Sequence, residues 1–253
     1  MPNNWTREQL IVTFNLYCKI PFAKSVQTNP DVIAVANLIG RSPGAVAFKL
    51  GNFGSFDPEL RRRGIGGLPN ASKLDREIWD EFNNNWDELA YQSEIVIAKF
   101  KEKPVDESFN IDLKELPIGG ERESLVKTRI NQHFFRISVL SIYGGKCCIT
   151  GLEIPSLLVA SHIVPWRHDV KNRTNPKNGL CLNALHDKAF DTGLITVTPD
   201  FKLLVSPRIS ELADNSIIDT LFLKYDRLEL ARPDKFFPDE EFLSFHNSEI
   251  FLS

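Results

Sequence analysis

Apolar residues recur at helical spacing through most of the first hundred positions, between polar residues that suit helix ends. The pattern predicts helices over about 6–18, 29–40 and 42–53. Ser42 is suited to cap the third helix, because its hydroxyl can accept from a free backbone amide. Gly40 is suited to end the second, since glycine tolerates a positive φ. These three segments indicate a small all-α domain at the start of the chain.

The second and third predicted helices are joined by a three-residue turn, a connection typical of a helix-turn-helix. In that motif the second helix enters the major groove, with its first residues nearest the bases. Residues 36–73 carry six basic and two acidic residues, which suits contact with phosphates. The residues predicted here to contact DNA are Arg41, Ser42, Lys49, Arg61, Arg62 and Arg63. A three-helix domain with a solvated arginine loop explains the same pattern without DNA.

A further amphipathic helix is predicted over 74–89, with Trp79 on its apolar side and its acidic residues, Asp75 among them, pointing away from any DNA. Residues 93–120 lose the periodicity and contain prolines and a glycine pair, which indicates a linker with a helical start. We therefore expect a helical DNA-binding domain at 1–92, a linker at 93–120 and a second domain at 121–253.

The second domain mixes helical and strand patterns, with a predicted core at about 143–198. A helix from residue 121 is stopped by Gly144 and Gly145. Short segments follow. The pattern predicts a strand and turn at 147–151, a second strand at 157–163, a polar loop at 166–177, a segment leading into a helix at 178–183 and a closing hairpin at 194–205. The predicted fold class is α+β, with an all-α helix-turn-helix-like domain ahead of this mixed one.

The formal net charge of −3 argues against a nucleic-acid partner, but the charges are unevenly distributed. Residues 121–190 carry ten basic and five acidic residues, whereas 191–253 carry six and twelve. Contact with phosphate needs local positive charge. The DNA-contacting side chains predicted in the basic block are Arg129, Gln132, Arg136 and Lys188. A helix face exposed to solvent explains the same basic residues without DNA.

Three residues in the core have side chains that can serve in acid–base chemistry or metal binding. His162 ends a predicted strand, Asn178 follows sixteen residues later, and His186 stands eight residues further on. A neutral histidine can take a proton from attacking water near pH 7. A histidine on a helix can also anchor a metal ion. Taken alone, however, these histidines are explained more simply as satisfied structural residues.

The segments that hold these three residues resemble the HNH nucleases, in which a two-stranded hairpin and a helix hold one divalent metal ion. The resemblance covers about 122–205 and points to a bacterial subgroup often described as restriction endonucleases. It implies that His162 is the general base, that Asn178 fixes the loop between strand and helix, and that His186 is a metal ligand. The segments that carry it are 129–136, 143–151, 160–166, 178–180 and 185–195.

This chain departs from many HNH relatives in the residue before the base, where Ser161 replaces an acidic residue or a histidine. A hydroxyl binds divalent cations more weakly than a carboxylate, which leaves the site one strong ligand short. Asp191 is the predicted replacement, while Asp187 should point elsewhere on a regular helix. The predicted ligands are thus His186, Asp191 and Ser161, for Mg²⁺ or Mn²⁺. A structural zinc is not expected, because the cysteines form no Cys-x-x-Cys pairs.

The first domain resembles one found ahead of HNH modules in restriction nucleases, some of them described as specific for 5-methylcytosine. The resemblance implies double-stranded DNA as partner, with modified cytosine as an open question, since methyl recognition needs a pocket or a groove contact. The segments that carry it are 5–11, 42–58 and 74–82.

We therefore predict a metal-dependent DNA endonuclease of a restriction or defence system. Because one site cuts one strand, a homodimer is expected. Two alternatives stay open: a non-enzymatic DNA-binding regulator with a degenerate HNH core, and a signal-gated nonspecific nuclease effector. The sequence has no apolar stretch of the roughly 18 residues that span a membrane and no secretory signal pattern, so a cytoplasmic location without membrane contact is expected.

Overall fold

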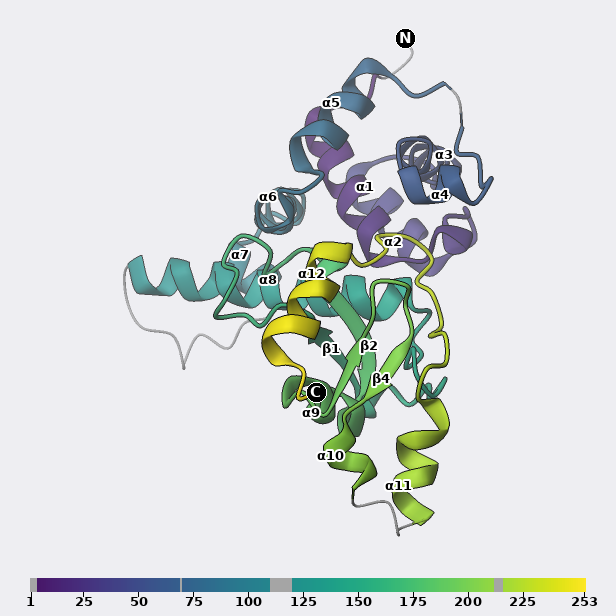
Figure 1. The fold of residues 1–253 in the computed structure, drawn as a ribbon. Coiled ribbons are helices and arrows are strands. Elements are labelled where there is room, and N and C mark those ends of the chain that lie inside the picture. Colours follow the sequence, from purple (N-terminus) through teal and green to yellow (C-terminus); the bar gives the residue numbers. More distant parts are fainter. Residues whose placement is uncertain (1–3, 69, 110–119, 212–215) are drawn as a thin grey trace. The chain divides into compact units, whose positions relative to one another are not determined.

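The computed structural model describes residues 4–68, 70–109, 120–211 and 216–253 (Figure 1). The chain divides into two compact units, Met1–Ser138 and Val139–Ser253. The division falls inside a long helix and not in the predicted linker at 93–120. None of the helices within the described residues is both long and apolar enough to span a membrane.

The N-terminal unit is all-α, and α1 is its centre. Residues Leu10–Cys18 of this helix are all buried, because α2, α3, α5 and α6 pack around it. The elements of the unit are α1 (Arg7–Lys19), η1 (Phe22–Lys24), α2 (Pro30–Ile39), α3 (Pro43–Gly54), α4 (Pro58–Arg62), α5 (Lys73–Phe82), α6 (Trp86–Phe100), α7 (Val105–Ser108) and most of α8 (Gly120–Ile142).

The predicted helix ends of the first three helices are confirmed. The Thr6 hydroxyl accepts from the Gln9 amide, and the Gln9 side chain accepts from the Thr6 amide, which completes a capping box. Ser42 Oγ accepts from the Ala45 amide at the start of α3. Gly40 ends α2 with φ of +67°. Local sequence therefore accounts for these helix boundaries.

The predicted single helix over 74–89 is wrong, because the chain breaks between α5 and α6. Asn84 adopts φ of +75°, a left-handed conformation that a helix cannot contain and that asparagine tolerates better than most residues. α6 then runs to Phe100, so the first part of the predicted linker belongs to the helical unit. Residues 110–119 of that linker lie outside the described residues.

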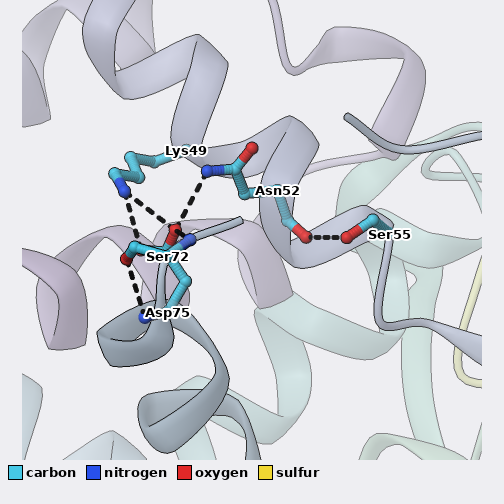
Figure 2. Close-up of polar contacts among 5 residues, drawn as sticks. All are labelled: Lys49, Asn52, Ser55, Ser72 and Asp75. Carbon is cyan, nitrogen blue, oxygen red and sulfur yellow. Dashed lines mark hydrogen bonds and ion pairs between the residues drawn. The ribbon is translucent and has the colours of Figure 1, made fainter. Parts of the chain in front are cut away.

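A buried polar cluster joins α3 to α5 (Figure 2). The Lys49 ammonium donates to both carboxylate oxygens of Asp75, each at 2.8 Å, and Asn52 Nδ2 donates to Asp75 Oδ2 at 3.0 Å. The backbone amide of Ser72 donates to the same oxygen at 2.8 Å. Asp75 is fully buried and Lys49 only 7% exposed. Asp75 is expected on the polar side of its helix, but it is buried in the unit because it neutralises a lysine from another helix.

The C-terminal unit places two small antiparallel sheets beside short helices. Its elements after the end of α8 are η3 (Pro155–Leu157), β1 (Leu158–His162), η4 (Pro176–Asn178), β2 (Gly179–Asn183), α9 (Ala184–Asp191), β3 (Ile195–Val197), β4 (Leu203–Val205), α10 (Pro207–Ser210), α11 (Ser216–Leu221), η5 (Leu223–Tyr225), α12 (Glu240–Phe245) and η6 (His246–Ile250). β1 pairs with β2 and β3 with β4. Gly144 and Gly145, both at positive φ, follow α8 as predicted, whereas 147–151 holds a turn and no strand.

The first sheet and α9 form a two-strand, one-helix unit. In the register of the sheet His162 lies opposite Gly179, and Leu158 lies opposite Asn183. Asn183 then caps α9 directly, because its Oδ1 accepts from the amides of Leu185 and His186. α9 packs on both strands. The end of β1, the start of β2 and one face of α9 are thereby held together.

His246 is buried in the C-terminal unit and makes the stability of this unit depend on pH. Its Nε2 donates to the Phe190 carbonyl, its Nδ1 accepts from Thr196, and its ring stacks on Phe190 at 3.6 Å. Burial lowers the pKa of His246 to about 4. The unfolded chain takes up a proton near pH 6.5 and the folded chain only near 4, so stability is full above pH 6.5. It should fall by up to about 3 kcal/mol as the pH is lowered to 4.

Urea denaturation at pH 7 and pH 4.5 measures this loss. We expect His246→Gln, which cannot take up a proton, to lose less free energy of unfolding between the two pH values than the wild type. The same loss in both proteins would show that His246 is not the responsible group.

Candidate active site

His162 is held by the loop that follows β1. Its Nε2 lies 2.8 Å from the carbonyl oxygen of Arg173, and its ring meets the edge of Trp166 at 5.6 Å between centroids. Because a carbonyl only accepts, Nε2 carries the proton of the neutral ring, and Nδ1 is the basic nitrogen. Burial lowers the pKa of His162; the Arg173 carbonyl opposes this shift, and the Arg173 charge adds to it. The ring is therefore neutral at pH 7 and able to accept a proton.

Asn178 closes the loop that holds His162. Its Oδ1 accepts from the Val164 amide at 2.8 Å, and its Nδ2 donates to the carbonyls of Val164 and Asn172 at 3.1 and 3.3 Å. The side chain is 1% exposed. Its own backbone carbonyl accepts from the Ile163 amide. Asn178 thus fixes the two residues that follow His162, which supports the positioning role that the sequence predicts for it.

The arrangement of His186 differs from that of a ready metal ligand. Its Nδ1 accepts from Asn183 Nδ2 at 2.8 Å, and its Nε2 donates to the Leu221 carbonyl at 2.8 Å. The rings of Phe222 and Tyr225 meet it edge-on. Both ring nitrogens are therefore used within the fold, and His186 fastens the 216–225 segment to α9. The structure does not support the prediction that His186 binds a metal.

α9 carries two neighbouring carboxylates: Asp187, which lies near Ser161 of β1, and the exposed Asp191, one helical turn further on. Asp187 lies close enough to the buried Ser161 hydroxyl for that hydroxyl to oppose the rise in its pKa, although Ser161 Oγ completes no hydrogen bond of full geometry within the described residues. Burial raises the pKa of Asp187; burial and then the charge of Asp187 raise the pKa of Asp191. Asp187 thus points to a different neighbour than the adjacent His186, as expected on a regular helix, and this makes it a candidate ligand beside Asp191. Helical spacing alone could have paired Asp187 with Asp191, since they are four residues apart.

These groups fit a hard cation in part. Within the described residues no three histidine, cysteine, aspartate or glutamate side chains gather as a complete metal site. Mg²⁺, however, usually keeps several waters and takes only one or two carboxylates together with substrate phosphate. Asp187 beside the buried Ser161 hydroxyl, with the Asp191 carboxylate one helical turn away, supplies donors of that kind. Asp187, Asp191 and Ser161 therefore fit Mg²⁺ better than the predicted set that includes His186.

A buried cysteine lies on the other side of His186. Burial raises the pKa of the Cys147 thiol, but hydrogen bonds involving His186 and Thr150 outweigh it and bring the pKa to about 7. Asn183 Nδ2 lies 3.7 Å from the sulfur. The Cys147 thiol and the His186 ring thus belong to the same buried polar cluster, which further explains why His186 turns toward the core.

Of the residues predicted to contact DNA from the N-terminal unit, some are bonded within the fold and the others are exposed. Arg41 donates to the Gln9 side chain and to the Asn4 carbonyl, and Ser42 caps α3. Lys49 is buried against Asp75, so the structure does not support its predicted contact with phosphate. The cluster Arg61–Arg63 is exposed, with Arg62 paired to Glu59.

The other predicted DNA contacts are all at the surface. Arg129, Gln132 and Arg136 lie on one exposed stripe of α8, and the apolar residues between them are buried. Lys188 is exposed on α9, next to Asp187. The structure therefore leaves these four side chains able to contact a phosphate backbone, and their role stays a prediction.

Comparison with protein families matches residues 147–198 to the family described as HNH endonuclease. The matched segment contains β1, β2, α9 and β3, with His162, Asn178 and His186. This match supports a nuclease, and thus a hydrolase that acts on DNA. Comparison with curated proteins finds no match.

Proposed function

We propose that this chain is a metal-dependent DNA endonuclease of a bacterial restriction or defence system. His162 Nδ1 accepts a proton from water as the water attacks phosphorus. The bond from phosphorus to the 3′ oxygen breaks, and that oxygen takes its proton from solvent. The observation that carries the proposal is the arrangement of His162, neutral and fixed through the Arg173 carbonyl and Asn178, inside the segment that matches HNH endonucleases.

A divalent cation, Mg²⁺ or Mn²⁺, would be held by Asp187 and Asp191 with Ser161 beside them. When bound it would supply positive charge to the phosphate and the departing oxygen. The carboxylates would orient it, and a bound cation would offset the cost of keeping them charged, which burial increases for both and the charge of Asp187 increases further for Asp191. This assignment replaces His186 with Asp187.

Double-stranded DNA is the proposed substrate, contacted by the Arg61–Arg63 cluster and by the Arg129, Gln132 and Arg136 stripe. Two copies of the chain would be needed to cut both strands, so we propose a homodimer. A cytoplasmic location belongs to the same proposal, and the effect of modified cytosine on cutting stays an open question that the test below addresses. The bonding of both His186 nitrogens favours one alternative, a DNA-binding regulator whose HNH core no longer cuts.

The test is cleavage of supercoiled plasmid that carries plain, 5-methyl or 5-hydroxymethyl cytosine, with Mg²⁺, Mn²⁺ or EDTA. Discrete, cation-dependent fragments support a restriction nuclease and show which modification matters. A smear supports the nonspecific effector instead. Binding in a gel shift without any cutting would replace the proposal with the regulator.

The proposed cation site predicts a loss of metal binding in Asp187→Asn. This change keeps the shape of the side chain but removes its charge, so we expect the affinity for Mn²⁺ to fall at least about 10-fold. Calorimetric titration with Mn²⁺ measures the affinity without requiring activity. Glu153→Gln, which alters an exposed carboxylate in the same unit, is the matched control. Equal affinities in both variants would exclude Asp187 as a ligand.

A further inference from the structure

Arg173 is fixed at three points in the loop that joins β1 to β2. Its carbonyl accepts from His162 Nε2, its Nε donates to the Trp166 carbonyl at 2.7 Å, and its Cζ lies 4.8 Å above the Trp166 ring. Trp166 also touches the edge of His162. The guanidinium is therefore held on the same aromatic ring as the candidate base, and its direction is set before any substrate binds.

The charge of Arg173 has no counterion in the part of the chain that the structure describes. Only its Nε donates a hydrogen bond there, and no carboxylate pairs with it. Arg173 is also half-buried, and a partly desolvated cation is costly unless an anion meets it. Its charge is near enough to His162 to contribute to the lowered pKa of that ring. A planar, pre-oriented guanidinium with unused donors is well suited to bind a phosphate.

We infer that Arg173 is a further catalytic residue, whose guanidinium contacts a non-bridging oxygen of the scissile phosphodiester beside His162. It forms no covalent bond; it offsets the negative charge that grows on phosphorus oxygens as water attacks. This inference rests on the proposed nuclease function and adds the anion-binding half of its site. Arg173 then has two roles: its backbone carbonyl orients the His162 ring, and its own guanidinium is positioned beside that ring.

The neighbouring cation of the loop provides a control. Lys171 lies two residues before Arg173 and is exposed. Its side chain contacts neither His162 nor Trp166 in any described hydrogen bond or ring contact. Removing Lys171 therefore changes the net charge of the loop by the same amount while leaving the geometry around His162 unchanged.

The experiment compares Arg173→Met, Arg173→Lys and Lys171→Met as full-length chains, on a plasmid that the wild type cuts. We expect Arg173→Met to lower kcat by about 100- to 1,000-fold with little change in KM, because the contact strengthens in the transition state. Arg173→Lys should retain part of the rate, and Lys171→Met should stay close to wild type. Millimolar guanidinium should restore part of the activity of Arg173→Met, whereas ammonium should not.

A rate for Arg173→Met equal to that of Lys171→Met would overturn the inference and leave the nuclease function intact. A lost rate that guanidinium does not restore, together with a lowered Tm, would assign Arg173 to loop stability alone. A wild type that cuts no substrate would overturn the proposed function, and the role of Arg173 with it.

Discussion

Replacing His162 with alanine is expected to lower the rate of DNA cleavage by about 100- to 10,000-fold while the protein remains folded. The reason is that general base catalysis contributes a factor of this size, and His162 is the base that the loop orients. The measurement is single-turnover cleavage of plasmid at saturating enzyme, with DNA binding followed separately by gel shift. Binding should stay within a few-fold of wild type, because the imidazole is neutral at pH 7.

His168 provides the matched control for this variant. It is an exposed histidine on the same loop whose ring meets that of Phe245 edge-on, and its removal should leave the rate within a few-fold of wild type. The pH profile adds a second check. Because burial lowers the pKa of His162 below 6.5, the wild-type rate should stay level down to mildly acidic pH and fall below it. Equal rates for His162→Ala and His168→Ala would remove His162 from the mechanism.

Replacing Asp75 with alanine is expected to reduce the free energy of unfolding of the N-terminal unit by about 3–5 kcal/mol. The change leaves the Lys49 ammonium buried without its counterion, which costs far more than the intact pair contributes. Urea denaturation measures the loss, with Trp79 and Trp86 as fluorescent probes in a Trp166→Phe background. These two tryptophans lie in the core of that unit and so report its unfolding.

Two further variants show whether burial of charge is the cause. The double variant Lys49→Met, Asp75→Leu removes both charges and should be considerably more stable than Asp75→Ala. Glu77→Ala, which removes an exposed acidic residue from the same helix, should change stability by no more than about 0.5 kcal/mol. A double variant as unstable as Asp75→Ala would mean that the Asn52 and Ser72 contacts dominate.

The helices of the first domain could be predicted from sequence because their ends are coded locally. The Thr6 capping box, the Ser42 cap and Gly40 each act within one helical turn. The role of Asp75 could not be predicted in this way. Periodicity placed it on the polar side of a helix, and only the packing of α3 against α5 brings Lys49 to it. An ion pair between two helices cannot be predicted from the spacing of residues within either helix alone.

The candidate site shows the same division. His162 and Asn178 could be identified from spacing and resemblance. The loop between them is closed by hydrogen bonds from the Asn178 side chain to the backbone of Val164, so the separation of the two residues in sequence reflects the structure of the loop. The resemblance implies that His186 is a metal ligand, yet Asn183 and Leu221, the latter thirty-five residues later, bond to its two ring nitrogens. Asp187 and Arg173 could not be identified in this way, because the role of Asp187 depends on its contact with β1, and that of Arg173 on how the loop folds its side chain back onto Trp166, seven residues earlier.

The hydrogen bonds of the Asn178 side chain also affect how readily this residue deamidates. Asn178 precedes Gly179, and an asparagine before glycine loses ammonia readily, since the small next residue lets its amide nitrogen attack the side-chain carbonyl. Here the Asn178 side chain is held in three hydrogen bonds and the Gly179 amide donates to the Pro176 carbonyl, so the attack is blocked. The folded state therefore preserves this asparagine. Each opening of the loop exposes it to an irreversible change into a carboxylate that could not donate to Val164, so the working lifetime of the molecule depends on how rarely this loop opens.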